Sequence, residues 1–490
     1  MSTKAPDSPA DRRSENRGWR HQIRRATRTD QGNLGPRKVR ELSYRIAGAG
    51  EWALFAAFLL TPLTTLRPGT SITFGDCLLA LVLAIAVVLV VLRRRLPVAL
   101  RWVWIGTALL FVSIATVEVF PPVSLEALIE TFSGTPYGSS IAGAARLMAA
   151  LVVFPVAVAT VVQRWVTIGL LVNAWIVGVS ISCGVAVIDA AAGTGLQASL
   201  ANNPSLVSDF LGLEPARYVG LSVHPTSFSV SVAMASPLVL GKMTDSGRVL
   251  RFSPLFLLFA FGVILSGSRG GLVGMALAIV LTIALNSDVR HAIFSKRPTV
   301  LLIIVAELAA CTALLLLGTP RPDPVIQPTP GTSKARAGAD GNGNVSRIDP
   351  FGDSAQVSNA EREKLVEESL DYVAERPVPG YGFQWIEASH SIYLQLLLSG
   401  GLIALLGYVL VIGGYFREGI RLRSRVPGYL RGVDVSLMIS MAVFLVMGLF
   451  QTDLLDRYLY LPVALILSMS ALLRRSESEA SSDENHESQR

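Results

Sequence analysis

Three arginines stand at boundaries between polar and apolar segments of this chain. Arg217 comes just before one apolar stretch, Arg269 lies in a Ser-Gly-Ser-Arg-Gly-Gly turn between two others, and Arg362 lies in a polar stretch that leads to a fourth. A planar guanidinium group can hold two phosphate oxygens at once. These positions therefore indicate an anionic, phosphate-bearing substrate. Each arginine alone also fits a side chain that only reaches toward lipid headgroups.

Two histidines accompany the arginines. His390 stands at the start of the apolar stretch 391–415, where the positive end of a helix dipole disfavours the imidazolium form, so the ring can accept a proton. His224 stands directly before Pro225, a residue suited to the first turn of a helix. Because single histidines also occur at membrane boundaries without a chemical role, His224 is either a site residue or an interfacial side chain.

Composition indicates a membrane protein. Of 490 residues, 51% are hydrophobic and only 16% are charged, and the mean hydropathy is +0.49. A soluble domain carries about 25% charged residues. We predict an all-α polytopic membrane protein with about twelve transmembrane helices, each long enough to cross a hydrocarbon core of roughly 30 Å. The spans are expected at 46–66, 73–92, 99–117, 139–162, 166–188, 225–241, 253–266, 270–286, 298–317, 391–415, 432–451 and 456–473.

The loop charges predict the orientation. If the N-terminus is cytoplasmic, most Lys and Arg residues fall in cytoplasmic segments and few fall in the loops on the other side, as the positive-inside rule requires. We therefore expect a multi-pass protein of the cytoplasmic (inner) membrane with both termini in the cytoplasm. The basic tail 1–45 and the tail 476–490 are polar enough to be disordered. The basic residues behind the net charge of +7 then lie beside anionic lipid, and no nucleic acid partner is expected.

The chain divides at one large extracytoplasmic loop between helices 9 and 10. Helices 1–9 occupy 46–317, the loop occupies 318–389, and helices 10–12 occupy 390–475. The first part of the loop is rich in Pro, Gly and Asn and is expected to be flexible.

The second part of the loop is expected to be a helix. Residues 358–361 match a capping box, and Val366 and the apolar residues after it recur at helical spacing. Arg362 would share the buried face with Val366, and Pro377 would end the helix.

Glu307 lies in the middle of the predicted span 298–317, where a carboxylate is costly and usually has a partner or a function. Arg146 is one candidate partner. The sequence shows no metal-ligand spacing, no P-loop, no dinucleotide fingerprint and no Gly-x-Ser-x-Gly turn. We therefore expect neither a metal ion nor a cofactor.

The order of the motifs resembles the superfamily of O-antigen ligases and O-antigen polymerases, membrane enzymes of cell-surface polysaccharide assembly. The resemblance spans residues 45–475. The matching features are Arg217-x-x-Gly220 with His224-Pro225, Ser268-Arg269-Gly270, Arg362, Pro377-x-x-Gly380-x-Gly382, His390-Ser391-x-Tyr393-Leu394, Gly400-Gly401, Asp76, and Asp453 with Arg457.

The resemblance implies a GT-C-like, inverting, metal-independent glycosyltransferase at the outer membrane face, with a glycan on undecaprenyl diphosphate as its donor. Arg217 and Arg362 would hold the diphosphate and stabilise the charge of the leaving group, and Arg269 would support that site or orient its turn. His390 would take the proton from the acceptor hydroxyl or orient it.

The same motifs add His224, Tyr393, Asp453 and Arg457 as supporting residues. The implied partners are the polyprenyl-diphosphate-linked glycan donor, a glycan or glycolipid acceptor, and the lipid bilayer. A polymerase and a ligase differ only in the acceptor, which the sequence leaves open.

Two other functions remain open at this point. A secondary transporter of a small anionic solute would have polar or broken helices that meet near the membrane midplane, together with internal repeats, and Glu307 is the feature in its favour. A scaffold or flippase-like partner without chemistry would tolerate replacement of His390 and of the arginines.

Overall fold

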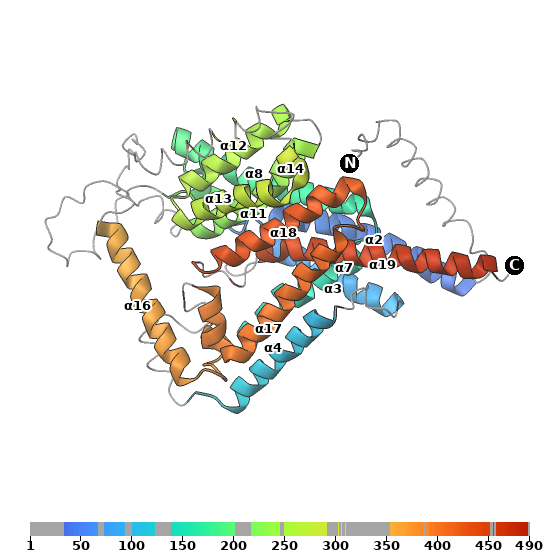
Figure 1. The fold of residues 1–490 in the computed structure, drawn as a ribbon, viewed down its shortest axis with the longest axis horizontal. Coiled ribbons are helices and arrows are strands. Elements are labelled where there is room, and N and C mark those ends of the chain that lie inside the picture. Colours follow the sequence, from blue (N-terminus) through green and yellow to red (C-terminus); the bar gives the residue numbers. More distant parts are fainter. Residues whose placement is uncertain are drawn as a thin grey trace, which may run out of the picture.

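The computed structural model is helical, and no strand occurs in the residues that it describes (Figure 1). This confirms the predicted all-α class for that part of the chain. The structure describes residues 34–66, 73–93, 100–122, 139–200, 217–245, 249–291, 353–385, 391–450 and 457–488, and the single residues Leu302, Val305, Ala309, Ser389 and Leu454.

The described helices follow the apolar segments of the sequence. In chain order they are α2 (Leu34–Leu60), α3 (Phe74–Arg93), α4 (Arg101–Val119), α6 (Ser140–Met148) with the π-helical turn η1 (Ala149–Val153) and α7 (Phe154–Val161), α8 (Trp165–Ala192), α9 (Leu196–Leu200), α11 (Pro225–Asp245), α12 (Val249–Leu265), α13 (Arg269–Leu285), α14 (Ser287–His291), α16 (Asp353–Glu375), η3 (Phe383–Trp385), α17 (Ile392–Leu422), η4 (Gly428–Leu430), α18 (Arg431–Met447), η5 (Arg457–Tyr460) and α19 (Leu461–Ser488).

Six of the described helical segments are long and apolar enough to cross a membrane, as expected of a multi-pass membrane protein. They are Phe74–Arg93, Arg101–Val119, Ser140–Val161, Trp165–Ala192, Ile392–Leu422 and Gly428–Met447, and the shorter apolar helices are Arg251–Leu265 and Arg269–Leu285. Helices also cover the spans predicted at 46–66, 225–241 and 456–473. Apart from three single positions, the span predicted at 298–317 lies outside the described residues, so the count of twelve stays a prediction.

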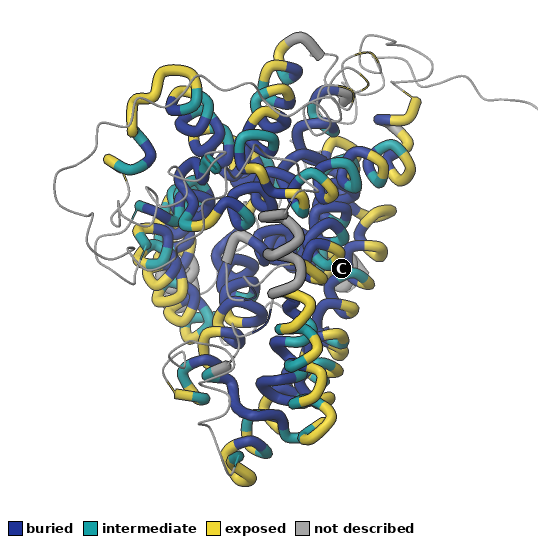
Figure 2. The backbone as a smooth tube through the Cα atoms, turned by 90° about the vertical axis from the view of Figure 1, so that its left-hand side faces the viewer, coloured by how far each residue is buried: buried dark blue, intermediate teal, exposed yellow. Residues whose placement is uncertain are grey.

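The helices pack around α11, which contacts α8, α12, α13 and α18. On one side of this group α4 lies along α17, and on another side α2 packs against α3 and α8 (Figure 1). Figure 2 shows that buried residues follow the inner faces of the helices and exposed residues the outer faces. Many exposed side chains of the apolar helices are themselves apolar, as lipid-facing positions require; examples are Val87, Phe111, Phe261 and Val280.

Both chain ends of the described fold lie at one end of the molecule. The start of α2 and the end of α19 are at the right of Figure 1, whereas α16, from the large loop, is at the left. This arrangement agrees with two termini on one membrane side and the loop on the other. Which side is cytoplasmic stays a prediction from the loop charges.

Several helix ends differ from the sequence-based expectation. α2 begins at Leu34, inside the tail predicted to be disordered, and α19 continues to Ser488, inside the other tail. These polar turns extend apolar helices and carry ion pairs, Arg45 with Glu41 at 3.0 Å and Arg425 with Glu477 at 3.3 Å.

The helix in the large loop is also longer than predicted. α16 starts at Asp353, so the expected capping box at 358–361 lies within the helix instead of at its start. The helix ends at Glu375, two positions before Pro377, because a proline disfavours helical geometry in the residue that precedes it.

Candidate functional site

Three arginines from separate parts of the chain come together at the α16 end of the molecule. Arg217 is half-buried, and the charges of Arg362 on α16 and Arg269 on α13 both act on it. Burial lowers the pKa of the Arg217 guanidinium, and the two neighbouring cations lower it further. Because an arginine stays protonated in proteins, the result is a concentrated positive charge. Among the described residues no carboxylate forms an ion pair with any of the three.

The turn between α12 and α13 holds Arg217 in place. The Arg217 Nε donates to the Ser266 carbonyl at 3.2 Å, and the Tyr218 N–H donates to the Leu265 carbonyl at 3.0 Å. Ser268 accepts from the Gly271 N–H at 3.1 Å and so caps the helix whose first residue is Arg269. The positive end of the α13 dipole therefore adds to the charge of the arginines.

A polar network after α8 fixes the other side of the segment that carries Arg217. The buried Gln197 accepts from the Val219 N–H at 2.9 Å and donates from Nε2 to Asp189 at 2.9 Å. Ser182 accepts from the Leu221 N–H at 2.8 Å. The segment is thus clamped between α8–α9 and the α12–α13 turn. Sequence reasoning missed Asp189 and Gln197, because they match no motif.

The glycines beside Arg269 have a packing role that the sequence did not show. A Cβ on Gly271 would lie 2.3 Å from the Ser229 Cβ on α11. A Cβ on Gly274 would lie 2.8 Å from the Met447 Sδ on α18. Small residues therefore let the first turns of α13 approach two other helices closely.

The start of α17 is linked to α13, the helix of Arg269, through the end of α18. The Ile392 N–H donates to the Gly448 carbonyl at 2.9 Å, directly after Met447, which packs on α13. His390 lies outside the described residues, but both of its neighbours are described and buried. The Gln395 side chain donates to the Ser389 carbonyl at 2.6 Å. The chain on either side of His390 is therefore anchored.

Tyr393, expected to support the site, binds the helix framework. Its hydroxyl donates to the Leu445 carbonyl of α18 at 2.6 Å. Asp76 is likewise a capping residue: it accepts from the Thr73 N–H at 2.9 Å, and its own N–H donates to the Thr73 hydroxyl at 3.1 Å.

The Pro-x-x-Gly-x-Gly motif clamps a break in α17. Gly401 has φ 65° and ψ −163°, a conformation open essentially only to glycine, and a Cβ there would lie 2.0 Å from the Val378 carbonyl oxygen. The backbone groups freed by the break bond to residues 377–382. The Tyr381 N–H donates to the Leu398 carbonyl at 2.6 Å, and the Gly382 N–H donates to the Ser399 carbonyl at 2.9 Å. The Leu402 N–H donates to the Pro377 carbonyl at 2.8 Å.

The remaining candidates are placed only in part. His224 is exposed, and its Nδ1 accepts from the Thr226 N–H at 3.5 Å. Arg362 is exposed as well, so the expectation that it lies on a buried face with Val366 is wrong: Val366 is only half-buried, and Leu370, one turn further on, is 49% exposed. Asp453, Glu307 and the side chain of Arg457 lie outside the described residues.

Within the described part of the chain, no group of three or more His, Cys, Asp or Glu side chains is arranged to hold a metal ion. The charged side chains that face one another at the site are the cations Arg217, Arg269 and Arg362. Such a set binds anions and suits phosphate oxygens in particular.

Residues 254–409 match the family model described as O-antigen ligase. This confirms, for that part of the chain, the resemblance inferred from the motifs. The matched region runs from α12 into α17 and includes Arg269, Arg362 and His390, whereas Arg217 precedes it. A comparison with curated proteins finds no match to this chain. The match indicates a membrane enzyme that processes glycans, of the O-antigen ligase or polymerase type.

Proposed function

We propose that this chain, with its O-antigen ligase region at 254–409, is an inverting, metal-independent glycosyltransferase. Its donor is a glycan on undecaprenyl diphosphate, and it transfers or polymerises that glycan at the outer face of the cytoplasmic membrane. Of the features of the molecule, the cluster of Arg217, Arg269 and Arg362 supports this proposal most strongly.

The arginine cluster suits a diphosphate leaving group. Three cations that lack carboxylate partners among the described residues repel one another, and a bound diphosphate removes that repulsion through charge-assisted hydrogen bonds. The same contacts strengthen as the glycosidic bond to the diphosphate breaks and negative charge grows on its oxygen. Arg217 and Arg362 hold the diphosphate in this proposal, and Arg269 supports them from the start of α13.

The transfer step is a displacement at the anomeric carbon. The acceptor hydroxyl oxygen forms the new bond on the face opposite the diphosphate, the bond to the diphosphate oxygen breaks, and that oxygen keeps the electron pair. His390 accepts the proton of the hydroxyl. The anchored backbone around His390 and the bond from the start of α17 to the end of α18, which packs on α13, support a place for this base near the arginines.

The break in α17 is the feature that a transporter would share, since transporters bind ions at broken helices. Here the backbone groups at the break are taken by residues 377–382. The break therefore favours a structural clamp over an ion site, and the transporter of a small anionic solute remains the weaker alternative.

The test is glycan transfer in vesicles from a lipid-diphosphate oligosaccharide, with all variants at matched expression. We expect His390→Ala, Arg217→Ala and Arg362→Ala to lose transfer. Lys364→Ala is the matched control for Arg362→Ala, because Lys364 is exposed on the same helix and its ion pair in the described part of the chain is with Glu368, at 3.6 Å. The length of the product distinguishes a polymerase from a ligase.

Full transfer by both His390→Ala and Arg217→Ala would contradict the assignment and favour the transporter. Equal losses in Arg362→Ala and Lys364→Ala would show that α16 matters only as a helix, and not through the charge of Arg362.

A further inference from the structure

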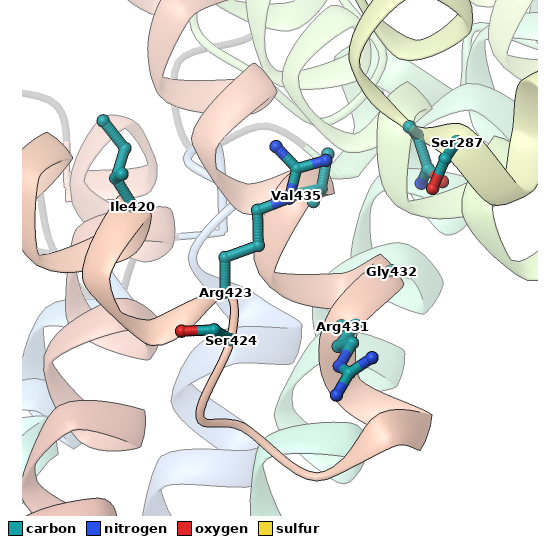
Figure 3. A pocket seen from close by; sticks show the side chains of 8 residues that line it. Ser287, Ile420, Arg423, Ser424, Arg431, Gly432 and Val435 are labelled. Atoms are coloured by element: carbon teal, nitrogen blue, oxygen red, sulfur yellow. The ribbon is translucent and has the colours of Figure 1, made fainter.

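A second group of arginines lies at the other end of α13 from Arg269. A 17-residue helix spans about 25 Å, so this place is separate from the proposed glycan site. Here the ends of α13 and α17 and the start of α18 surround a cavity of about 510 Å³ (Figure 3). Cavities of roughly this volume hold small ligands.

The lining of this cavity is cationic and polar. Arg423 extends from the end of α17, and Arg431 stands at the start of α18 (Figure 3). The remaining lining residues are Asn286, Ser287, Ile420, Ser424, Gly432 and Val435. Two guanidinium groups, two hydroxyl groups and an amide form a set of donors suited to phosphate oxygens.

Among the described side chains, most of the charge in this lining has no neutralising partner. Arg423 donates to the Leu285 carbonyl at 3.2 Å, which uses one of its five N–H donors. The buried Asp434 interacts electrostatically with Arg423. Among the described residues neither Arg423 nor Arg431 forms an ion pair with a carboxylate within 4.0 Å. Counted over the described side chains, two cations against one more distant carboxylate leave a net positive site.

One wall of the cavity continues into a lipid-facing surface. Ile420 lines the cavity and is 65% exposed. Leu402, Leu406 and Val409 are exposed too, and at 3.6 residues per turn they share the face of α17 that carries Ile420. A molecule with its phosphate in the cavity could therefore lay apolar chains along α17.

We propose that this cavity binds the phosphate-bearing headgroup of an anionic phospholipid. The predicted orientation places it at the cytoplasmic face, where anionic lipids attract basic pockets between transmembrane helices. A soluble phosphate compound shares the chemistry of the headgroup but not the acyl chains. The proposal concerns Arg423 and Arg431 alone and does not depend on glycan transfer.

The test uses the full-length protein purified in neutral detergent, with bound lipid counted by native mass spectrometry. Phosphatidylglycerol is titrated against phosphatidylcholine, and glycerol 3-phosphate is titrated in a parallel series. We expect retention of phosphatidylglycerol over phosphatidylcholine, weakened roughly fivefold by Arg423→Gln and by Arg431→Gln.

Arg417→Gln is the matched control, because Arg417 is an exposed arginine of α17 that does not line the cavity. It should bind phosphatidylglycerol like the parent protein, and the melting temperature of each variant without lipid shows that it is folded. Equal retention by all variants, or no preference over phosphatidylcholine, would overturn the proposal. Arginine-dependent binding of glycerol 3-phosphate as tight as that of the lipid would overturn the lipid assignment in favour of a soluble phosphate.

Discussion

The two ends of α8 show two different uses of arginine. At its start, Arg164 pairs with the buried Glu51, which also accepts from the Thr167 hydroxyl at 2.9 Å and the Gln163 N–H at 3.0 Å. At its other end, about 40 Å away for 28 residues, Asp189 and Gln197 hold the backbone that carries Arg217, and no carboxylate of the described residues pairs with its guanidinium.

A second paired network strengthens this contrast. The buried Glu418 accepts from Ser470 and lies 3.3 Å from Arg474 and 3.8 Å from Arg421. A carboxylate that neutralises an arginine makes that arginine part of the framework. Arginines gathered without such a partner retain the capacity to bind an external anion, and the three at the α16 end do so together.

The strongest test of the comparison is Arg217. We expect Arg217→Ala to lower glycan transfer about a hundredfold, because a donor to the developing charge of the leaving group is lost. Arg217→Lys should recover only part of the rate, since an ammonium group cannot grip two oxygens in one plane. Initial rates at matched folded protein measure this effect. Retention of more than half the rate by Arg217→Ala would contradict a role for Arg217 in binding the leaving group.

The Glu51–Arg164 pair at the start of α8 should affect stability and not glycan transfer. Glu51→Gln leaves Arg164 without its counter-charge and weakens the bonds from Thr167 and Gln163, so we expect a loss of stability of about 2 kcal/mol. Thermal unfolding in detergent measures it. Glycan transfer per folded molecule should stay the same, and a transfer defect without a stability defect would mean that the two ends are not distinct.

Two glutamines, one at each end of α8, should also differ in their effects on transfer and stability. Gln197→Leu should slow transfer about tenfold, or about 1.4 kcal/mol in activation free energy, because the segment that carries Arg217 loses its anchor. The expected signature is a raised KM for the lipid-diphosphate donor. Arg475 donates to the side-chain oxygen of Gln163 at 2.9 Å, beside the Glu51–Arg164 pair. Gln163→Leu should therefore lower stability without changing that KM. Identical behaviour of the two variants would argue against a positioning role for Gln197.

The smallest effect is expected at the surface. Arg425 and Glu477 form an ion pair in which both side chains are about half exposed, and such pairs contribute little in water. Arg425→Ala should therefore change stability by less than about 0.5 kcal/mol and leave transfer unaffected. A melting shift as large as that of Glu51→Gln would show that pairing alone, without burial, makes an arginine structural.

In the described part of the chain, helices occur at the predicted apolar spans, since a run of apolar residues long enough to span a bilayer has few other stable arrangements. The sequence predicted the helix ends less well. The starts of α2 and α16 and the end of α19 lie in polar segments, where ion pairs and local propensity decide the boundary and leave little mark on hydropathy.

Within the candidate site, the motifs did not reveal what several of their residues contact. Tyr393 and Asp76 matched family positions, yet their side chains bind backbone groups of the framework. Gly380, Gly382 and Gly401 turned out to hold a broken helix together. Such roles depend on partners far along the chain, which periodicity and spacing do not reveal.

The helical class, the apolar segments and the boundary positions of the arginines can be derived from the sequence, because each follows from local composition and the thickness of a bilayer. The partners of the arginines cannot be derived in this way, because they depend on where distant segments pack. Glu51 reaches Arg164 across the start of α8, whereas Arg217, Arg269 and Arg362 converge from three segments at the α16 end.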